Sequence, residues 1–339
     1  MPVSIRHNVN LTDLNTFGVA ARARSYAEVR DIDELRAALK QRNSTEPLLI
    51  LGGGSNLLLT QDFPGLVLHN KLLGKNITAQ DADTNYVEAA AGENWHDFVR
   101  WTLDQQLAGL ENLSLIPGTV GAAPIQNIGA YGVEMKDTFQ SLQAIDIVDG
   151  AIRTFDREQC RFAYRDSVFK RELKQHYIIA SVTFRLPRAA RLHLDYGDVR
   201  AELASMGCAT PSARDVSDVI CNIRRRKLPD PAVIGNAGSF FKNPIVDRGI
   251  LARIQTSHDN VPHYSAPDDH VKLAAGWLIE QCGWKGKSLG RAAVHEQHAL
   301  VLVNRGGASG AEILALARAI QHAVRERFQV ELEAEPVIV

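Results

Sequence analysis

The sequence has no excess of positive charge. Its 339 residues include 38 lysines and arginines against 39 aspartates and glutamates, a formal net charge of −1 at pH 7. A protein that binds nucleic acid through the phosphate backbone usually carries a basic excess or a long basic stripe. The only dense basic run is the short stretch Arg224–Lys227. The composition therefore argues against a nucleic-acid partner.

Cysteine is scarce, and long apolar runs are absent. The four cysteines, Cys160, Cys208, Cys221 and Cys282, are far apart and form no CxxC pair. This spacing argues against a structural zinc site and against a secreted disulfide framework. Residues 1–24 contain no apolar stretch long enough for a signal peptide, and no window reaches the roughly 20 apolar residues of a membrane-spanning helix. We expect a soluble cytoplasmic protein without membrane insertion.

Two common nucleotide-binding fingerprints and a metal-ligand spacing are also missing. Neither GxGxxG after a strand nor GxxxxGK[ST] occurs, so a bound dinucleotide needs a different fold from the Rossmann or P-loop types. His295 and His298 are three residues apart, but the apolar run that follows them indicates a strand, on which such positions face opposite sides. We predict no metal site.

The remaining pattern is that of an ordinary globular chain of two or three packed units. It is 45% hydrophobic and 23% charged. Periodicity predicts a helix capped by Asp31, a helix over 93–106, and helices around 216–223, 273–278 and, after a Ser309–Glu312 capping box, 313–324. Strands are predicted at 48–51, 66–68, 86–89, 178–184 and 330–334. The irregular stretch 187–211 is the expected domain junction.

Two glycine-rich segments stand out in the first half of the chain. Gly52–Asn56 follows an apolar strand, and Pro117–Gly132 has neither helical nor strand periodicity throughout. Glycines let backbone N–H groups approach an anion closely, and long irregular stretches in compact domains are usually functional. A glycine run alone is more often a sharp turn. The spacing supports a phosphate ligand and does not select a cofactor.

The motifs themselves are more specific than their composition. Asn15–Gly18, Gly52–Asn56, Ile116–Gly121, Gln126–Gly132, Tyr164–Ser167, Lys227–Pro229 and Gly235–Pro244 together resemble the UDP-N-acetylenolpyruvoylglucosamine reductase (MurB) family nearly end to end. The resemblance implies an α+β protein, with a two-part FAD-binding fold of the PCMH/vanillyl-alcohol-oxidase type followed by a C-terminal α+β substrate-binding domain. The expected parts are 1–71 with 329–339, 72–205, and 206–328.

The resemblance also implies non-covalent FAD, reduced by NADPH. The implied cofactor-binding residues are Gly53, Gly54, Ser55, Asn56, Gly118, Gly121, Gln126, Asn127, Gly129 and Tyr131. The implied substrate is a UDP-sugar carrying an enolpyruvyl group, an intermediate of peptidoglycan synthesis. No obligate protein partner is evident.

Three residues match the family's catalytic positions. Arg165 suits a carboxylate, which a guanidinium can grip with two hydrogen bonds; alone, it would be read as an ion pair with Asp166. Ser239 matches the proton donor, although Gly-Ser-Phe-Phe alone is more often a turn entering a core strand. Glu335 matches the second catalytic carboxylate. Because Ala334-Glu335-Pro336 departs from the family's pattern, Glu333 remains the alternative.

Four further residues match substrate contacts of the family: Tyr196, Lys227, Asn243 and Lys285. Tyr196 also marks the subclass with a mobile tyrosine loop that closes over the substrate and excludes water. His298 matches another proposed contact of the family. Two rival functions share some of these features: a flavin oxidase of the same fold, which would turn over with oxygen, and a non-enzymatic nucleotide-sugar binding protein, which would be colourless.

Overall fold

The computed structural model describes residues 3–188 and 191–339 and divides into two compact units. The first unit comprises the chain up to residue 9, 23–53 and 64–226; the second comprises 10–22, 54–63 and 227–339. The sequence-based division into three parts stays a prediction.

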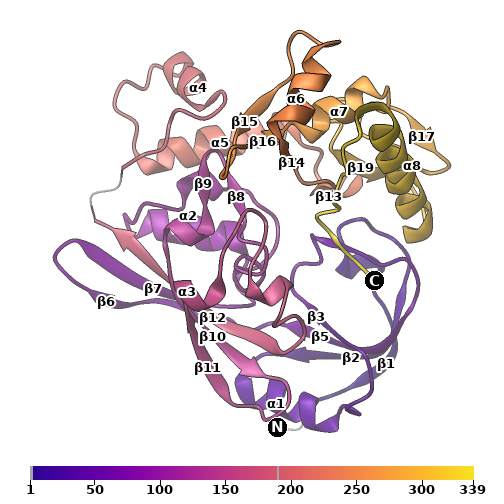
Figure 1. Ribbon diagram of the computed structural model, residues 1–339. Coiled ribbons are helices and arrows are strands. Elements are labelled where there is room, and N and C mark those ends of the chain that lie inside the picture. The colour runs from indigo at the N-terminus through magenta and orange to yellow at the C-terminus, as the bar shows by residue number, and fades with distance from the viewer. Residues whose placement is uncertain (1–2, 189–190) are drawn as a thin grey trace. The chain divides into compact units, whose positions relative to one another are not determined.

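The first unit contains a four-stranded sheet in the order β1-β2-β5-β3. Its strands are β1 (Arg6–Asn10), β2 (Arg22–Val29), β5 (Phe63–Asn70) and β3 (Leu48–Leu51), and α1 (Ile32–Gln41) packs on it (Figure 1). Asp31 caps α1, as predicted, by accepting a hydrogen bond from the Glu34 N–H at 2.7 Å. Leu35 and Ala38 are fully buried against the sheet, and burying one leucine stabilises the fold by about 2 kcal/mol.

A second, antiparallel sheet in the same unit has the order β11-β10-β12-β7-β6. Helix α2 (Trp95–Asp104) confirms the helix predicted over 93–106; it buries Trp95 and Phe98 against Phe184 of the sheet, with ring centroids 5.8 and 5.2 Å apart. The strands are β6 (Lys75–Gln80), β7 (Thr84–Ala90), β10 (Phe139–Asp146), β11 (Ile152–Asp156) and β12 (Tyr177–Pro187).

Short elements complete this unit. Helices α4 and α5 bury Val199, Leu203, Val216 and Ile220 in one cluster. The elements are α3 (Arg157–Cys160), α4 (Val199–Ser205), α5 (Ala213–Lys227), the hairpin β8 (Gly129–Ala130) and β9 (Val133–Glu134), and the 3₁₀ helices η2 (Glu111–Leu113), η3 (Val120–Ala122), η4 (Met135–Asp137) and η5 (Val168–Lys170).

The second unit holds three small sheets, three α-helices and one 3₁₀ helix. Helix α8 (Gly310–Phe328) begins at the predicted Ser309–Glu312 capping box and packs on strands β17–β19. The sheets are β13 (Gly235–Ser239), β19 (Val301–Asn304), β18 (Ala292–Val294) and β17 (Ser288–Leu289); β14 (Ile245–Asp247), β16 (His270–Leu273) and β15 (His263–Ser265); and β4 (Leu57–Leu58) with β20 (Val337–Ile338). The other elements are α6 (Arg248–Gln255), α7 (Ala275–Gln281) and η1 (Thr12–Leu14).

The strand predicted over 330–334 is wrong. The alternation is real, since Val330 and Leu332 are buried, but the segment has only an isolated bridge, Phe241 with Ala334. Its carbonyls are satisfied individually, for example that of Leu332 by the Gln321 side chain at 2.7 Å. An alternation of apolar and polar residues shows which side chains are buried, whereas a strand also needs a neighbouring strand to form its backbone hydrogen bonds.

No helix within the described ranges is long and apolar enough to cross a membrane.

Candidate functional site

The first glycine loop, Gly52–Asn56, follows β3 and contacts the second glycine loop at Gly118 and Thr119. A Cβ added at Gly53 would lie 3.1 Å from Cα of Gly118, and one added at Gly52 would lie 2.6 Å from Oγ1 of Thr119. The two loops therefore touch nearly backbone to backbone, which requires a residue without a side chain at the contact. Both loops were predicted from sequence; their contact was not, because they are far apart in the chain.

The amides of the first loop are available to an anion. Across residues 3–188 and 191–339, no acceptor takes a hydrogen bond from the backbone N–H of Gly53, Gly54 or Ser55. Consecutive N–H groups of this kind form an anion-binding concavity. Gly54 has φ 62°, and a Cβ there would lie 2.0 Å from the carbonyl oxygen of Leu14. The loop fits the pyrophosphate of a dinucleotide.

A buried histidine lies behind this loop. His69 of β5 pairs with Leu51 of β3, directly before Gly52, and its Nδ1 lies 2.7 Å from Oη of Tyr26. Burial, assisted by the positive charge of Lys71, lowers the pKa of His69 to about 4. Burial also raises the pKa of Tyr26 to about 12. At pH 7 both groups are therefore neutral.

The second glycine loop is anchored on the chain that precedes α2. The N–H groups of Val120 and Gly121 donate to the carbonyls of Glu93 and Ala91, each at 2.9 Å. A Cβ at Gly121 would lie 2.4 Å from Cβ of Ala91. Gly121 thus serves the close packing of the loop, with its amide already engaged in the protein.

Asn127, also predicted to bind the cofactor, is fully buried. Its Nδ2 donates to Oε2 of Glu134 and to the carbonyl of Ala163, both at 3.0 Å, and its Oδ1 accepts from the N–H of Lys136 at 3.0 Å. The Asn127 side chain thus stabilises the second glycine loop through hydrogen bonds to neighbouring segments of the protein. Three other predicted contacts are half-buried: Gln126, Gly129 and Tyr131.

Arg165 is held beside this same loop. Its Nη2 donates to the carbonyl of Gly129 at 2.7 Å, and its guanidinium lies 5.2 Å from the ring centroid of Tyr164. The carboxylate of Asp166 pairs with Arg171 at 2.6 Å. The alternative role of Arg165, an ion pair with Asp166, is therefore not the arrangement in the structure.

In the second unit, Ser239 ends β13 and the C-terminal segment runs beside it. The N–H of Glu335 donates to the carbonyl of Phe240, the residue after Ser239, at 2.8 Å. The Nδ2 of Asn56 donates to the carbonyl of Glu335 at 3.3 Å. The fold of this unit thus brings Ser239, Glu335 and the end of the first glycine loop into neighbouring segments.

The alternative carboxylate, Glu333, has a different environment. It forms an ion pair with Lys242 at 2.5 Å, and its carbonyl accepts from the Lys242 N–H at 3.0 Å. The Lys242 side chain is only 9% exposed, so it needs this counter-charge. The Glu333 carboxylate is therefore the counter-ion of Lys242, and the choice between Glu333 and Glu335 as the catalytic carboxylate stays a prediction. A lysine directly after two buried phenylalanines, Phe240 and Phe241, is the local pattern that indicates a buried cation in need of a partner.

The predicted substrate residues lie in both units. In the second unit, Oδ1 of Asn243 accepts from the N–H of Ala275 at 2.9 Å and caps α7, while Lys285 pairs with Glu280 at 3.0 Å. Lys227 is the last residue of α5. In the first unit, the Tyr196 side chain is 46% exposed.

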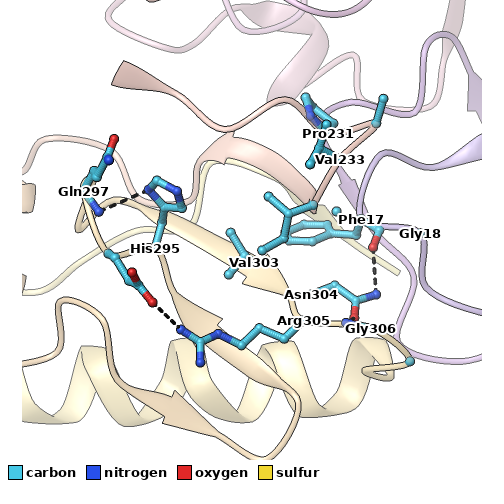
Figure 2. A pocket seen from close by; sticks show the side chains of 15 residues that line it. Phe17, Gly18, Pro231, Val233, His295, Gln297, Val303, Asn304, Arg305 and Gly306 are labelled. Carbon is cyan, nitrogen blue, oxygen red and sulfur yellow. Dashed lines mark hydrogen bonds and ion pairs between the residues drawn. The ribbon is translucent and has the colours of Figure 1, made fainter. Parts of the chain in front are cut away.

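The second unit also has a hollow of about 850 Å³ (Figure 2). None of the predicted site residues lines it. Its polar groups bind one another: Arg305 pairs with Glu296 at 3.0 Å, and Nδ2 of Asn304 donates to the carbonyl of Phe17 at 2.9 Å. We therefore assign it no ligand.

The chain matches two protein-family models and several known proteins. Residues 23–156 match an FAD binding domain, and residues 230–339 match the C-terminal domain of UDP-N-acetylenolpyruvoylglucosamine reductase. The reductase of Pseudomonas aeruginosa is 56% identical over 337 residues, 99% of each chain. That of Burkholderia vietnamiensis is 54% identical over 339 residues, covering 99% of this chain and 97% of the relative. The crystal structure of MurB from Thermus caldophilus matches with a TM-score of 0.70 and 24% identity, over 99% of both chains.

Proposed function

The chain belongs to the UDP-N-acetylenolpyruvoylglucosamine reductase family, and from this premise we propose that it uses NADPH to reduce UDP-N-acetylglucosamine enolpyruvate to UDP-N-acetylmuramate. Membership confirms the predicted resemblance, the α+β fold with its FAD-binding part, and FAD as the cofactor of an oxidoreductase. The observation that carries the proposal is the position of Ser239 beside the segment of Glu335, because this reduction needs a proton donor near the reacting carbon.

FAD, when bound, supplies the hydride for the terminal carbon of the enolpyruvyl group. The protein must then stabilise the negative charge that develops on the adjacent carbon and its carboxylate. We assign this task to Arg165, which stays positively charged and whose orientation is fixed by the carbonyl of Gly129.

Ser239 donates the proton that completes the reduction. An ordinary hydroxyl releases its proton reluctantly, so the donor needs a strongly basic acceptor and exact placement. Glu335 orients this donor or polarises the enolpyruvyl group, and its backbone bond to Phe240 supports that role. We keep Glu335, which matches the family's position, as the catalytic carboxylate, and assign Glu333 the role of counter-ion to Lys242.

Binding of the UDP-sugar is assigned to Tyr196, Lys227, Asn243 and Lys285. A diphosphate calls for fixed cations and hydrogen-bond donors. Asn243 uses Oδ1 to cap α7, and its Nδ2 donates to none of the residues that the structure describes. We also propose a cytoplasmic location, which the four free cysteines support.

The test is Ser239→Ala, measured as two half-reactions in anaerobic stopped flow. We expect flavin reduction by NADPH to stay within about twofold, and re-oxidation by the enolpyruvyl sugar to slow by roughly 10²- to 10⁴-fold, the usual contribution of a general acid. Ser265→Ala, at an exposed serine of β15 in the same unit, is the matched control and should change neither step. Normal re-oxidation by Ser239→Ala would overturn the assignment.

A further inference from the structure

Asn112 links two segments of the first unit that the proposed chemistry uses. It lies in η2 and is 1% exposed. Its Nδ2 donates to the carbonyl of Tyr131 at 3.0 Å and to the carbonyl of His193 at 2.8 Å. Tyr131 belongs to the second glycine segment, and His193 is three residues before Tyr196. One buried carboxamide thus holds both main chains at once.

The segment around Tyr196 makes further contacts within its unit, among them an ion pair between Asp195 and Arg200. Leu192 and Leu194 pack on the cluster that α4 and α5 form. The ring of Tyr196 meets that of Tyr131 edge-on, with centroids 6.3 Å apart. These apolar contacts are non-directional and do not by themselves set the position of the segment along its neighbour. The bond from Asn112 to His193 is directional and fixes the register of this segment against Tyr131.

The carbonyl oxygen of the Asn112 side chain indicates why residue 112 is an asparagine. Its Oδ1 is buried and has no hydrogen-bond partner among the described residues. A buried acceptor without a partner is costly, and such a group in a native structure needs an explanation. The two hydrogen bonds that Nδ2 donates explain it, because they set the orientation of the carboxamide and so leave Oδ1 without a donor.

We propose that Asn112 is a positioning residue for the substrate step: by binding the carbonyls of Tyr131 and His193 together, it presents Tyr196 to the substrate in one arrangement. This rests on the proposed function in one respect, namely that Tyr196 contacts the UDP-sugar. Asn112 itself touches neither substrate nor cofactor in this proposal and acts only through the segment it holds.

The experiment uses the full-length, FAD-loaded enzyme and the variants Asn112→Ala and Asn112→Leu. The leucine variant keeps the branched shape of the side chain, removes both donors and adds no charge to this buried position, so it tests the proposal even if the alanine variant fails to fold. We expect KM for the enolpyruvyl sugar to rise about fivefold to tenfold, the effect of losing the bond to His193, which is the one of the two that positions the segment of Tyr196. Flavin reduction by NADPH should stay within about twofold. Hydrogen exchange should accelerate in residues 191–198.

Asn70→Ala is the matched control. Asn70 is a buried asparagine of the same unit whose Nδ2 donates to the carbonyl of Ile179 at 3.1 Å and whose Oδ1 accepts from the Leu72 N–H at 3.1 Å. Its loss should lower stability without changing KM or exchange in residues 191–198. If Asn70→Ala raises KM as much as Asn112→Ala does, the role of Asn112 is merely structural and the proposal fails.

A double variant separates failure of this inference from failure of the proposed function. If Asn112 acts through Tyr196, then Asn112→Ala in a Tyr196→Ala background should add nothing to KM. Full additivity of the two changes would overturn the inference. If Tyr196→Ala alone leaves KM unchanged, the proposed substrate contact is wrong, while exchange in residues 191–198 still reports whether Asn112 holds that segment. Unchanged exchange in both Asn112 variants would refute the link itself.

Discussion

Acidification should destabilise the protein through His69, and replacing this residue should remove that part of the pH dependence. His69 is 6% exposed and its pKa in the folded protein is about 4, compared with about 6.5 for an unfolded chain. Between about pH 6.5 and pH 4, His69 binds a proton in the unfolded chain but stays neutral in the folded protein. The free energy of unfolding therefore falls as the pH drops from about 6.5 to about 4, and this contribution then levels off.

The magnitude follows from the two pKa values. Between pH 7.5 and pH 4.5 the single group accounts for a loss of about 2.5 kcal/mol, at 1.36 kcal/mol for each pKa unit. That is a large part of the stability of a typical domain. His69→Leu cannot bind the proton, so its stability should fall by about 2.5 kcal/mol less than that of the wild type over this range. Carboxylates that titrate in the same range contribute equally to both proteins and cancel in the comparison.

The assay is urea unfolding of both proteins at pH 7.5 and pH 4.5, followed by tryptophan fluorescence at a fixed FAD concentration, because a ligand that binds only the folded state adds to its stability. The difference between the two pH values, and not the absolute stability, is the measured quantity. His69→Leu also loses the hydrogen bond to Tyr26, which lowers its stability at both pH values alike. Equal pH dependence in the two proteins would refute the reasoning.

Two further predictions concern the glycine loop and the C-terminal carboxylates. Gly121→Ala should lower the free energy of unfolding by about 1–3 kcal/mol and weaken FAD retention, because its Cβ would lie 2.4 Å from that of Ala91. The control Gly249→Ala, at an exposed helical position with open space around it, should raise stability slightly. Equal urea midpoints for the two variants would contradict this prediction. Glu335→Gln should slow flavin re-oxidation by the substrate about 100-fold. Glu333→Gln should lower the urea midpoint with little change in that rate, since it breaks the ion pair of the buried Lys242. The reverse pattern would make Glu333 the catalytic carboxylate and Glu335 the structural one.

Helix ends could be predicted from sequence because their determinants are local. Asp31 caps α1, and Ser309 with Glu312 forms the capping box of α8; in each case the bonding groups lie within one helical turn. The strand expected over 330–334 failed because its determinant is a partner segment elsewhere in the chain, and here that partner provides only an isolated bridge.

The candidate site was predictable as a set of motifs, but not as a set of contacts. The two glycine loops, Arg165 and Ser239 follow from the resemblance. The ion pair of Lys242, the bonds of Asn112 and the burial of His69 depend on which side chains tertiary structure brings together. Asn127 illustrates the limit: its motif predicts a contact with the cofactor, which stays a prediction, and that motif did not predict the three hydrogen bonds by which Asn127 joins segments of the protein.

Backbone strain around the site has the same origin. Leu115, Asn127, Tyr131 and Arg165 all have φ between 44° and 58°, a region that residues other than glycine rarely adopt. Each such residue costs about 1–3 kcal/mol and persists only where its surroundings determine the conformation. Asparagine is enriched in this region, but no local sequence signal marks Leu115, Tyr131 or Arg165, since leucine, tyrosine and arginine have no preference for it.

The side chains that hold the main chain can be identified for two of these residues, Leu115 and Tyr131. The N–H of Leu115 donates to Nδ1 of His96 at 3.0 Å, and its carbonyl accepts from Nε of Arg224 at 3.2 Å. Asn112 binds the carbonyl of Tyr131. In each case a side chain from another element binds the main chain of the strained residue. The loops of the first unit are therefore shaped from outside their own sequence, so substitutions at His96 or Asn112 should disturb them as much as substitutions within the motifs.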